Sequence, residues 1–208
     1  MDATCIILAG GKSVRLGRNK VVEKIGAQSL LERVVSILQG LSCEIIVVAG
    51  ADSVLPELKG VPDLKVVKDI YPGKGSQGGI YTGLVSSHNF HNLVIGCDMP
   101  FLNTDLIKYL FNIAYGFDVV VPRLSSDIFE PLHAVYSQSC IVPLELLIKQ
   151  DKLRILDLYE MVTVRYVTGG EIDRFDPERR SFFNINTESD LKSGRELARK
   201  EVSSIDKR

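Results

Sequence analysis

The chain has 208 residues, of which 45% are hydrophobic, and this length and apolar content predict one domain with a sizeable core. It carries 25 Lys and Arg against 26 Asp and Glu, so it lacks the basic surplus that is typical of nucleic-acid-binding proteins. No apolar run approaches the ~20 residues that span a bilayer, and the N-terminus lacks the basic region of a signal peptide, which together indicate a cytoplasmic protein.

The first predicted strand, residues 4–8, opens directly into a loop that is rich in glycine and basic residues. The paired glycines Gly10 and Gly11 let the backbone approach a ligand closely and leave amide protons free to point at its oxygens. Arg15 and Lys20 add side chains that form charge-assisted hydrogen bonds with an anion. The loop therefore predicts a triphosphate site, and an ordinary strand-to-helix turn is the alternative.

Two common nucleotide-binding motifs do not fit this loop. Gly11-Lys12-Ser13 is similar to the end of a Walker A motif, but that motif requires a glycine at the position of Ile6. The dinucleotide-binding fingerprint requires a glycine at Lys12 or at Ser13, depending on which glycine begins it. The loop is therefore neither a P-loop nor a dinucleotide loop.

Helix-like segments and apolar strands alternate along the rest of the chain. Ser29 and Glu32 form a capping box before an apolar stripe, and Gly40 stands where a C-cap glycine belongs, so this helix is marked at both ends. Further strands are predicted at residues 44–49, 64–67, 93–97, 118–121, 133–136 and 162–167, and further helices at residues 80–85, after Thr104, at residues 142–148 and after Thr187. This alternation predicts an α/β fold with a mostly parallel sheet and helices on both faces.

The last residues are charged and lose the apolar stripe. We therefore predict one domain over residues 1–194 and a frayed or disordered tail over residues 195–208.

Acidic residues follow two of the predicted strands. Ligands of open α/β sheets bind at the carboxyl ends of the strands, so we expect Gly10, Asp69 and Asp98 on one rim. Asp98 precedes Met99-Pro100 and suits Mg²⁺, which takes one or two protein carboxylates together with phosphate oxygens and water. The alternative for both aspartates is a residue that caps a turn.

A second glycine-rich segment, residues 73–79, precedes the helix predicted at residues 80–85. Glycines at this density fit a backbone that lies against a flat or anionic ligand, and a flexible surface loop is the alternative.

The cysteines and histidines show no catalytic pattern. The four cysteines contain no C-x-x-C pair and are expected to be buried free thiols. Cys97 is assigned to the core, because the neighbouring carboxylate disfavours a thiolate. The three histidines show no spacing typical of a metal site or a catalytic triad.

Four motifs resemble the molybdopterin guanylyltransferase family, whose members attach GMP to the pterin phosphate of the molybdenum cofactor. The resemblance covers residues 4–191, and the order and spacing of the motifs are more specific than any one of them. The motifs are Leu8-Ala9-Gly10-Gly11 with Ser13, Arg15, Gly17 and Lys20; Cys97-Asp98-Met99-Pro100-Phe101-Leu102; Glu130-Pro131-Leu132-His133-Ala134-Val135-Tyr136; and Phe183-Asn184-Ile185-Asn186-Thr187.

The resemblance implies a Rossmann-like nucleotidyltransferase fold and roles for individual residues. Arg15 and Lys20 would act in catalysis, Asp98 would bind Mg²⁺, and Asn184 and Asn186 would face the pterin. The residues implied to bind the nucleotide are Leu8, Ala9, Gly10, Gly11, Lys20, Asp69 and Asp98. GTP and molybdopterin would be the substrates, with transient contact with other proteins of cofactor biosynthesis and with no nucleic acid or membrane as partner.

The choice of base also follows from the resemblance. Paired glycines favour GTP over CTP, because related cytidylyltransferases tend to carry Ala-Gly there. The chain departs from the family pattern at two places, which bear on the base more than on nucleotidyl transfer. Gly75-Ser76-Gln77-Gly78-Gly79 replaces Gly-Pro-Leu-Ala-Gly, and Ala49-Gly50 stands where an Asn is common.

We therefore expect the terminal phosphate of molybdopterin to attack the α-phosphorus of GTP in line and to release pyrophosphate. A phosphate monoester is largely ionised at neutral pH, since its second pKa is about 6, so the reaction requires no general base. One alternative is a nucleotidyltransferase that uses CTP or acts on a sugar phosphate, against which the Asn184-Ile185-Asn186 motif argues. The other is a non-catalytic nucleotide-binding module, against which Lys20 and Asp98 together argue.

Overall fold

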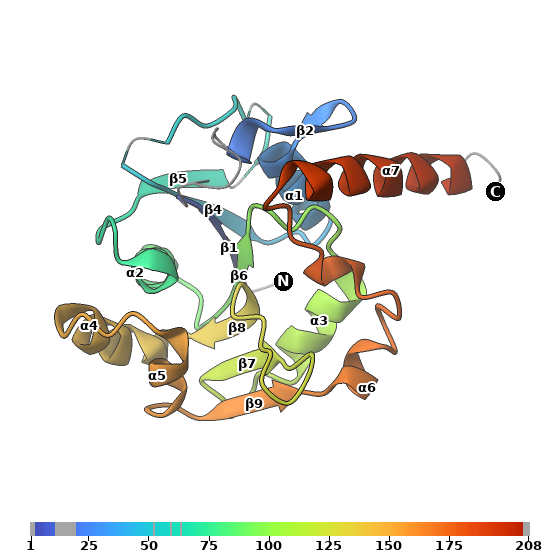
Figure 1. Ribbon diagram of the computed structural model, residues 1–208. Coiled ribbons are helices and arrows are strands. Elements are labelled where there is room, and N and C mark those ends of the chain that lie inside the picture. The colour runs from blue at the N-terminus through green and yellow to red at the C-terminus, as the bar shows by residue number, and fades with distance from the viewer. Residues whose placement is uncertain (1–2, 11–19, 52, 59, 63, 206–208) are drawn as a thin grey trace.

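Seven strands form one central sheet, and helices cover both of its faces (Figure 1). The structure is a computed structural model that describes residues 3–205 apart from residues 11–19, 52, 59 and 63. The strands of the sheet are β1 (Thr4–Ala9), β4 (Glu44–Ala49), β5 (Leu64–Lys68), β6 (His91–Gly96), β7 (Val119–Pro122), β8 (His133–Ser137) and β9 (Val164–Val167). Their order across the sheet is β5-β4-β1-β6-β8-β7-β9.

The sheet is mostly parallel, as predicted, and β8 is the exception. β1 pairs in parallel with β4 and β6, β4 with β5, and β7 with β9, whereas β8 runs antiparallel to both β6 and β7. Every residue of β8 is buried, and a continuous apolar run does not encode the direction of a strand. The parallel strands β5, β4, β1 and β6 end at one edge of the sheet, which is where Gly10, Asp69 and Asp98 follow them.

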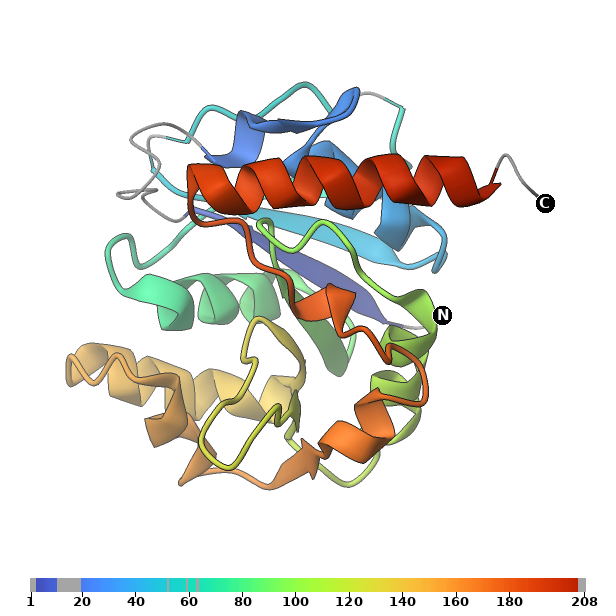
Figure 2. The same ribbon diagram turned by 45° about the vertical axis from the view of Figure 1, so that its right-hand side comes forward.

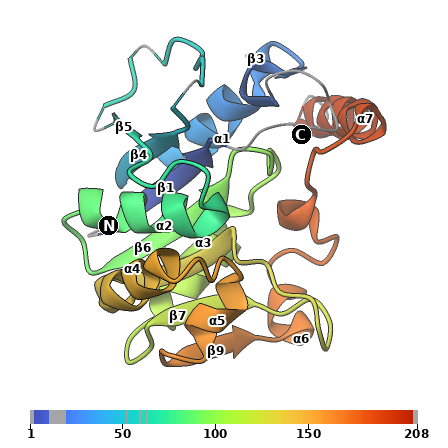
Figure 3. The same ribbon diagram turned by 60° about the vertical axis from the view of Figure 1, so that its left-hand side comes forward.

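Alternate strand residues supply two hydrophobic layers. Cys5 and Ile7 of β1 pack with α1 (Leu30–Gln39), α3 (Thr104–Asn112) and α6 (Gly169–Ile172). Ile6 points to the other face, where it packs with α2 (Gly75–Ser86), α4 (Ile141–Lys149) and α5 (Ile155–Tyr159). Figure 3 shows α2 and α4 side by side over this second face. The prediction of an α/β fold with helices on both faces is confirmed.

The helix caps agree with the sequence in one case and differ in another. The Ser29 hydroxyl accepts a hydrogen bond from the Glu32 backbone, and the Glu32 carboxylate accepts one from the Ser29 backbone, so the predicted capping box of α1 is confirmed. At α3 the cap is Asn103, whose side chain accepts hydrogen bonds from Asp105 N and Leu106 N, and not Thr104.

The last helix, α7 (Glu188–Ile205), is longer than expected and lies beside the hairpin of β2 (Lys24–Ile25) and β3 (Gln28–Ser29), as Figure 2 shows. The Thr187 hydroxyl accepts a hydrogen bond from Asp190 N at 3.1 Å, as predicted for its cap. The proposed boundary between residues 194 and 195 falls inside this helix. Ala198 is buried and Leu197 packs beside it, so the apolar stripe continues past the boundary and the separate tail is corrected.

The cysteines are free thiols. Cys5, Cys97 and Cys140 are buried and Cys43 is half-buried, which confirms the predicted burial for the first three. Burial, together with the Asp98 charge, raises the pKa of Cys97 to about 12, which fits its assignment to the core.

Candidate active site

Three of the predicted site residues form one hydrogen-bonded cluster at the carboxyl edge of the sheet. Lys20 begins the 3₁₀ turn η1 (Lys20–Val22), Asp98 follows β6, and Asn186 precedes α7. The Lys20 Nζ donates to Asp98 Oδ2 at 2.7 Å and to Asn186 Oδ1 at 2.5 Å. The Lys20 and Asp98 side chains are 14% and 20% exposed, so solvent reaches this ion pair only in part.

Backbone hydrogen bonds hold the segments that carry this cluster. Ile185 N donates to Asp98 O at 3.0 Å, which joins the last segment to the end of β6. The Asp190 carboxylate accepts from Asn186 N at 3.0 Å. From α1, the Arg33 Nε donates to Pro100 O at 2.8 Å, and its guanidinium lies 4.9 Å from the centre of the Phe101 ring.

A third hydrophobic cluster ties the same segments together. It joins the hairpin near Lys20, the loop after Asp98 and the segment before Asn186 to α7. Its members are Ile25, Leu30, Phe101, Ile185, Leu191 and Ala198. The three polar side chains are therefore positioned by one apolar contact region rather than by isolated loops.

Glu130 also belongs to this site, although the sequence motif that contains it indicated no role for it. Burial and the Asp98 charge raise the pKa of Glu130 to about 7. The antiparallel ladder of β6 and β8 continues one step to a hydrogen bond from Gly96 N to Leu132 O at 3.0 Å, which brings the segments carrying Asp98 and Glu130 together. Glu130 approaches Asp98 because β8 runs antiparallel to β6, and the sequence does not indicate the direction of β8.

The first glycine of the anion loop makes a close backbone contact. A Cβ added to Gly10 would lie 2.9 Å from Gly50 N, and one added to Gly50 would lie 3.0 Å from Gly10 O. Neither position therefore has room for a side chain. Gly11 and Arg15 lie outside the described residues.

The remaining predicted nucleotide-binding residues have structural roles in this arrangement. The Ala9 side chain is buried and Leu8 packs in the α2 layer, so a ligand would meet their backbone. Asp69 Oδ1 accepts hydrogen bonds from Tyr71 N at 3.0 Å and from Thr82 Oγ1 at 3.1 Å. These are the bonds of a turn-forming aspartate, and none of them joins Asp69 to the Lys20 cluster.

The second glycine-rich segment is helical over most of its length, because α2 already begins at Gly75. A Cβ on Gly83 would overlap Ile6 Cγ2 and lie 2.9 Å from Ile6 Cδ1, and one on Gly79 would lie 3.1 Å from a Leu8 methyl carbon. These two glycines therefore let the helix pack closely on β1. Gly73, with φ of 83°, and Gly75, with φ of 62°, are the positions in the segment that need left-handed backbone.

The two asparagines of the last motif make different contacts. Asn186 bonds to Lys20, whereas Asn184 Nδ2 donates to Phe182 O at 3.5 Å. Asn186 therefore belongs to the Lys20 cluster. Of the two asparagines, only Asn184 has a side-chain oxygen without a hydrogen-bond partner among the described residues.

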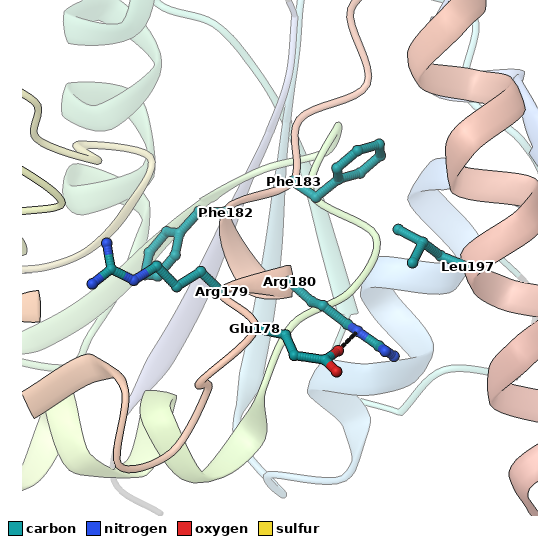
Figure 4. A pocket seen from close by; sticks show the side chains of 6 residues that line it. All are labelled: Glu178, Arg179, Arg180, Phe182, Phe183 and Leu197. Atoms are coloured by element: carbon teal, nitrogen blue, oxygen red, sulfur yellow. Dashed lines mark ion pairs between the residues drawn. The ribbon is translucent and has the colours of Figure 1, made fainter. Parts of the chain in front are cut away.

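A hollow of about 330 Å³ lies between the turn η3 (Arg180–Phe182) and α7 (Figure 4). Phe183 and Leu197 face one another across it, and Arg180 forms an ion pair with Glu178. Its lining residues are Glu178, Arg179, Arg180, Phe182, Phe183 and Leu197, so this hollow is distinct from the Lys20 cluster.

Comparison with known proteins assigns the family. Residues 5–162 match the MobA-like NTP transferase domain. The chain belongs to this family. It is 35% identical over 198 residues to a probable molybdenum cofactor guanylyltransferase of Pelotomaculum thermopropionicum, covering 95% of this chain and 94% of the relative. It is 34% identical to a protein of the same name from Methanosarcina mazei, covering 91% and 88%.

Solved structures of the family and of other nucleotidyltransferases share the fold. A molybdopterin-guanine dinucleotide biosynthesis protein A from Archaeoglobus fulgidus superposes with a TM-score of 0.79 at 29% identity, covering 95% of this chain and 99% of that one. The 2-C-methyl-D-erythritol 4-phosphate cytidylyltransferase of Thermus thermophilus superposes with a TM-score of 0.67 at 15% identity, covering 93% and 98%. The predicted Rossmann-like nucleotidyltransferase fold is thereby confirmed.

The described residues contain neither a large cluster of metal-binding side chains nor a membrane-spanning helix. Nowhere in this part of the chain do three or more His, Cys, Asp or Glu side chains gather as they would around a metal ion. Among the helices described, none has both the length and the apolar character needed to cross a membrane.

Proposed function

We propose that this protein transfers GMP from GTP to the terminal phosphate of molybdopterin, forming the guanine dinucleotide cofactor and pyrophosphate in the cytoplasm. The relatives that carry the guanylyltransferase name over most of their length support this reaction. The observation that carries the proposal is the convergence of Lys20, Asp98 and Asn186 at the carboxyl edge of the sheet. Transient contact with other proteins of cofactor biosynthesis remains part of the proposal.

The groups of this chain would bind and orient phosphates rather than remove a proton. The attacking phosphate is already largely ionised, since its second pKa is about 6. The Lys20 ammonium would neutralise charge on the transferring phosphate, and backbone amides of the loop after β1 would bind phosphate oxygens. Arg15 is the proposed second cation of this site.

The oxygen donors of the cluster fit Mg²⁺. The Asp98 carboxylate and the Asn186 amide oxygen both contact one cation, the Lys20 ammonium. Hard divalent cations prefer carboxylate and amide oxygens, and Mg²⁺ needs only one or two protein carboxylates. We therefore propose Asp98 as its ligand. When bound, Mg²⁺ would supply charge neutralisation for the nucleotide phosphates and the leaving pyrophosphate.

The reaction is tested by incubating the protein with molybdopterin and Mg²⁺, together with either GTP or CTP. Pyrophosphate release and the dinucleotide formed are then measured by an enzyme-coupled assay and by chromatography. We expect the guanine dinucleotide and stoichiometric pyrophosphate with GTP. Preferred formation of the cytosine dinucleotide, or turnover with a sugar phosphate in place of molybdopterin, would overturn the assignment.

The role of Lys20 is tested by Lys20→Ala. We expect turnover to fall by roughly 10²-fold or more, because a preorganised charge at a phosphoryl-transfer site is lost. Lys24→Ala, which changes an exposed lysine on the nearby hairpin, is the matched control and should keep most of the activity. Unchanged turnover of a folded Lys20→Ala protein would remove Lys20 from the mechanism.

A further inference from the structure

We propose that the Lys20 ammonium and the divalent cation compete for one position, so that Asp98 takes up metal only after the ammonium has been drawn away. This inference rests on the proposed function, because it concerns the metal of that reaction. It adds an order of events, in which the nucleotide phosphates displace Lys20 and thereby open the metal site.

The geometry places Lys20 where a metal would find its ligands. The Nζ lies 2.7 Å from the Asp98 carboxylate and 2.5 Å from the Asn186 amide oxygen, and both are oxygen donors of the type that Mg²⁺ prefers. The ammonium therefore occupies the position that a metal ion bound to these oxygen atoms would take. The Asp190 carboxylate accepts a hydrogen bond from the Asn186 backbone N–H, and this bond keeps the Asn186 segment in place when Lys20 leaves.

The charges explain why both cations cannot remain. Mg²⁺ binds oxygen at about 2.0–2.1 Å, so a metal on Asp98 would lie next to the ammonium that already contacts the same carboxylate. With the Lys20 and Asp98 side chains only 14% and 20% exposed, water screens this repulsion poorly. Without its ammonium the site keeps the Asp98 charge, and Asp190 and Glu130 add acidic groups around it.

Nucleotide phosphates are the groups that can move Lys20. The lysine stands at the end of the glycine-rich segment that follows β1, and its long flexible stem carries a compact charge that suits a phosphate oxygen. A triphosphate offers more negative charge than Asp98 alone, so it would attract the ammonium away from the carboxylate. The inference predicts weak metal binding before the nucleotide arrives and strong binding afterwards.

Manganese provides a direct test without turnover. Mn²⁺ shares the oxygen-ligand preference of Mg²⁺, and the free ion is counted by electron paramagnetic resonance. The nucleotide-free wild-type protein is compared with Lys20→Gln, which keeps hydrogen-bonding groups but lacks the charge, and with Lys24→Gln as the matched control. We expect Lys20→Gln to bind Mn²⁺ at least roughly tenfold more tightly than wild type, and Lys24→Gln to match wild type.

A double variant shows where the gained metal binds. Lys20→Gln combined with Asp98→Asn should lose the gain, because the carboxylate that holds the metal is then absent. Unchanged or weaker Mn²⁺ binding by folded Lys20→Gln, or a gain that survives Asp98→Asn, would overturn the inference. Circular dichroism and thermal unfolding establish that each variant is folded.

If the Lys20 variants do not fold, the inference is tested by Mn²⁺ binding to the wild-type protein. A dissociation constant for Mn²⁺ weaker than about 100 μM without nucleotide is expected, and tighter binding would contradict competition by Lys20. The proposed function is judged separately, by the dinucleotide that forms from GTP and molybdopterin. Failure of that reaction leaves the Mn²⁺ measurements intact, so the two failures are distinguishable.

Discussion

Asn184 and Asn186 stand two residues apart in one segment, yet their amides make different hydrogen bonds. Asn186 accepts from Lys20 and Asn184 donates to Phe182 O. We therefore expect Asn186→Ala to lower kcat by roughly tenfold or more, because the metal site beside Asp98 loses its amide oxygen donor. Asn184→Ala should mainly raise the KM for molybdopterin. Steady-state kinetics of the two single variants separate these roles, and equal effects on both parameters would refute the distinction.

Glu130 should make stability depend on pH. Its pKa is raised from 4.5 to about 7, first by burial and then by the Asp98 charge. A carboxyl with a raised folded-state pKa contributes stability below pH 4.5, and this contribution is lost as the pH rises through 7. Glu130→Gln removes that loss. The free energy of unfolding, measured with urea, is compared for Glu130→Gln and wild type at pH 5 and at pH 8.5. We expect the difference between variant and wild type to be more favourable to the variant at pH 8.5 by about 1 kcal/mol.

The outcome for Glu130 is checked against a carboxyl in a different environment. Asp105→Asn changes an exposed carboxylate that pairs with Lys108 on α3, so its difference from wild type should vary little over the same pH range. If the free energies of unfolding of Glu130→Gln and wild type differ by the same amount at both pH values, the charged form of Glu130 is not disfavoured in the folded state.

At the scale of the element, α2 depends on glycines that face β1. A Cβ on Gly83 would overlap Ile6, which is fully buried in a central strand and has little freedom to move. Overpacking costs about 1–3 kcal/mol, and it exceeds the gain of at most about 1 kcal/mol in helix propensity. We therefore expect Gly83→Ala to lower the melting temperature by several degrees.

Gly170→Ala is the matched control for this substitution. Gly170 lies in α6, has no positive φ, and a Cβ there would meet no atom within 4 Å. The same chemical change should thus be neutral or stabilising at residue 170 and destabilising at residue 83. Similar shifts in melting temperature at the two positions would mean that close packing on β1 is not the reason for the α2 glycines.

The last helix shows how a charged element supports the site. Gly194 approaches the Ile185 and Ile25 side chains so closely that a Cβ would lie 3.0 and 3.1 Å from their Cδ1 atoms. Ala198 continues this contact one turn later. The helix is therefore held to the two segments that carry Asn186 and Lys20, although its exposed side chains between residues 188 and 200 are mostly charged.

For the whole molecule, local patterns predicted what depends on local chemistry. The capping box began α1 correctly, and the strand ends placed Asp98 and Gly10 on one edge of the sheet. The cluster of Lys20, Asp98 and Asn186 could be predicted only in part from the sequence, because the contact of Lys20 with Asn186 joins residues 166 positions apart. A glycine that serves backbone freedom and one that serves close packing also look alike in a sequence, so the start of α2 was predicted at Ile80 although it lies at Gly75.

The direction of β8 controls which residues approach the site. A buried apolar strand carries no local sign of its direction, and the antiparallel pairing with β6 is what brings the segment of Glu130 toward Asp98. The tail was misjudged for a related reason. Its apolar residues are few, and Ala198 and Leu197 pack in a cluster with Ile25 and Ile185, which come from distant segments.

The resistance of the whole domain to acid should depend on His133 in β8. The ring is fully buried, and burial lowers the pKa of His133 from 6.5 to about 4, although the nearby Asp176 charge opposes this shift. The folded protein therefore keeps this histidine neutral, whereas the unfolded chain takes up a proton below pH 6.5. Stability linked to His133 is complete above pH 6.5 and is lost as the pH falls toward 4, by about 3 kcal/mol in total.

The measurement is the free energy of unfolding, from urea titrations, of wild type and His133→Phe at pH 7.5 and pH 4.5. Phenylalanine retains the ring contact with Phe182, whose centre lies 5.0 Å from that of His133, and it cannot bind a proton. We expect the variant to lose less stability than wild type between the two pH values. His88→Phe is the control, because His88 is outside the buried core and its replacement should leave the acid dependence unchanged. If wild type and His133→Phe lose the same stability on acidification, the acid sensitivity of this fold arises from its carboxylates and not from the buried histidine.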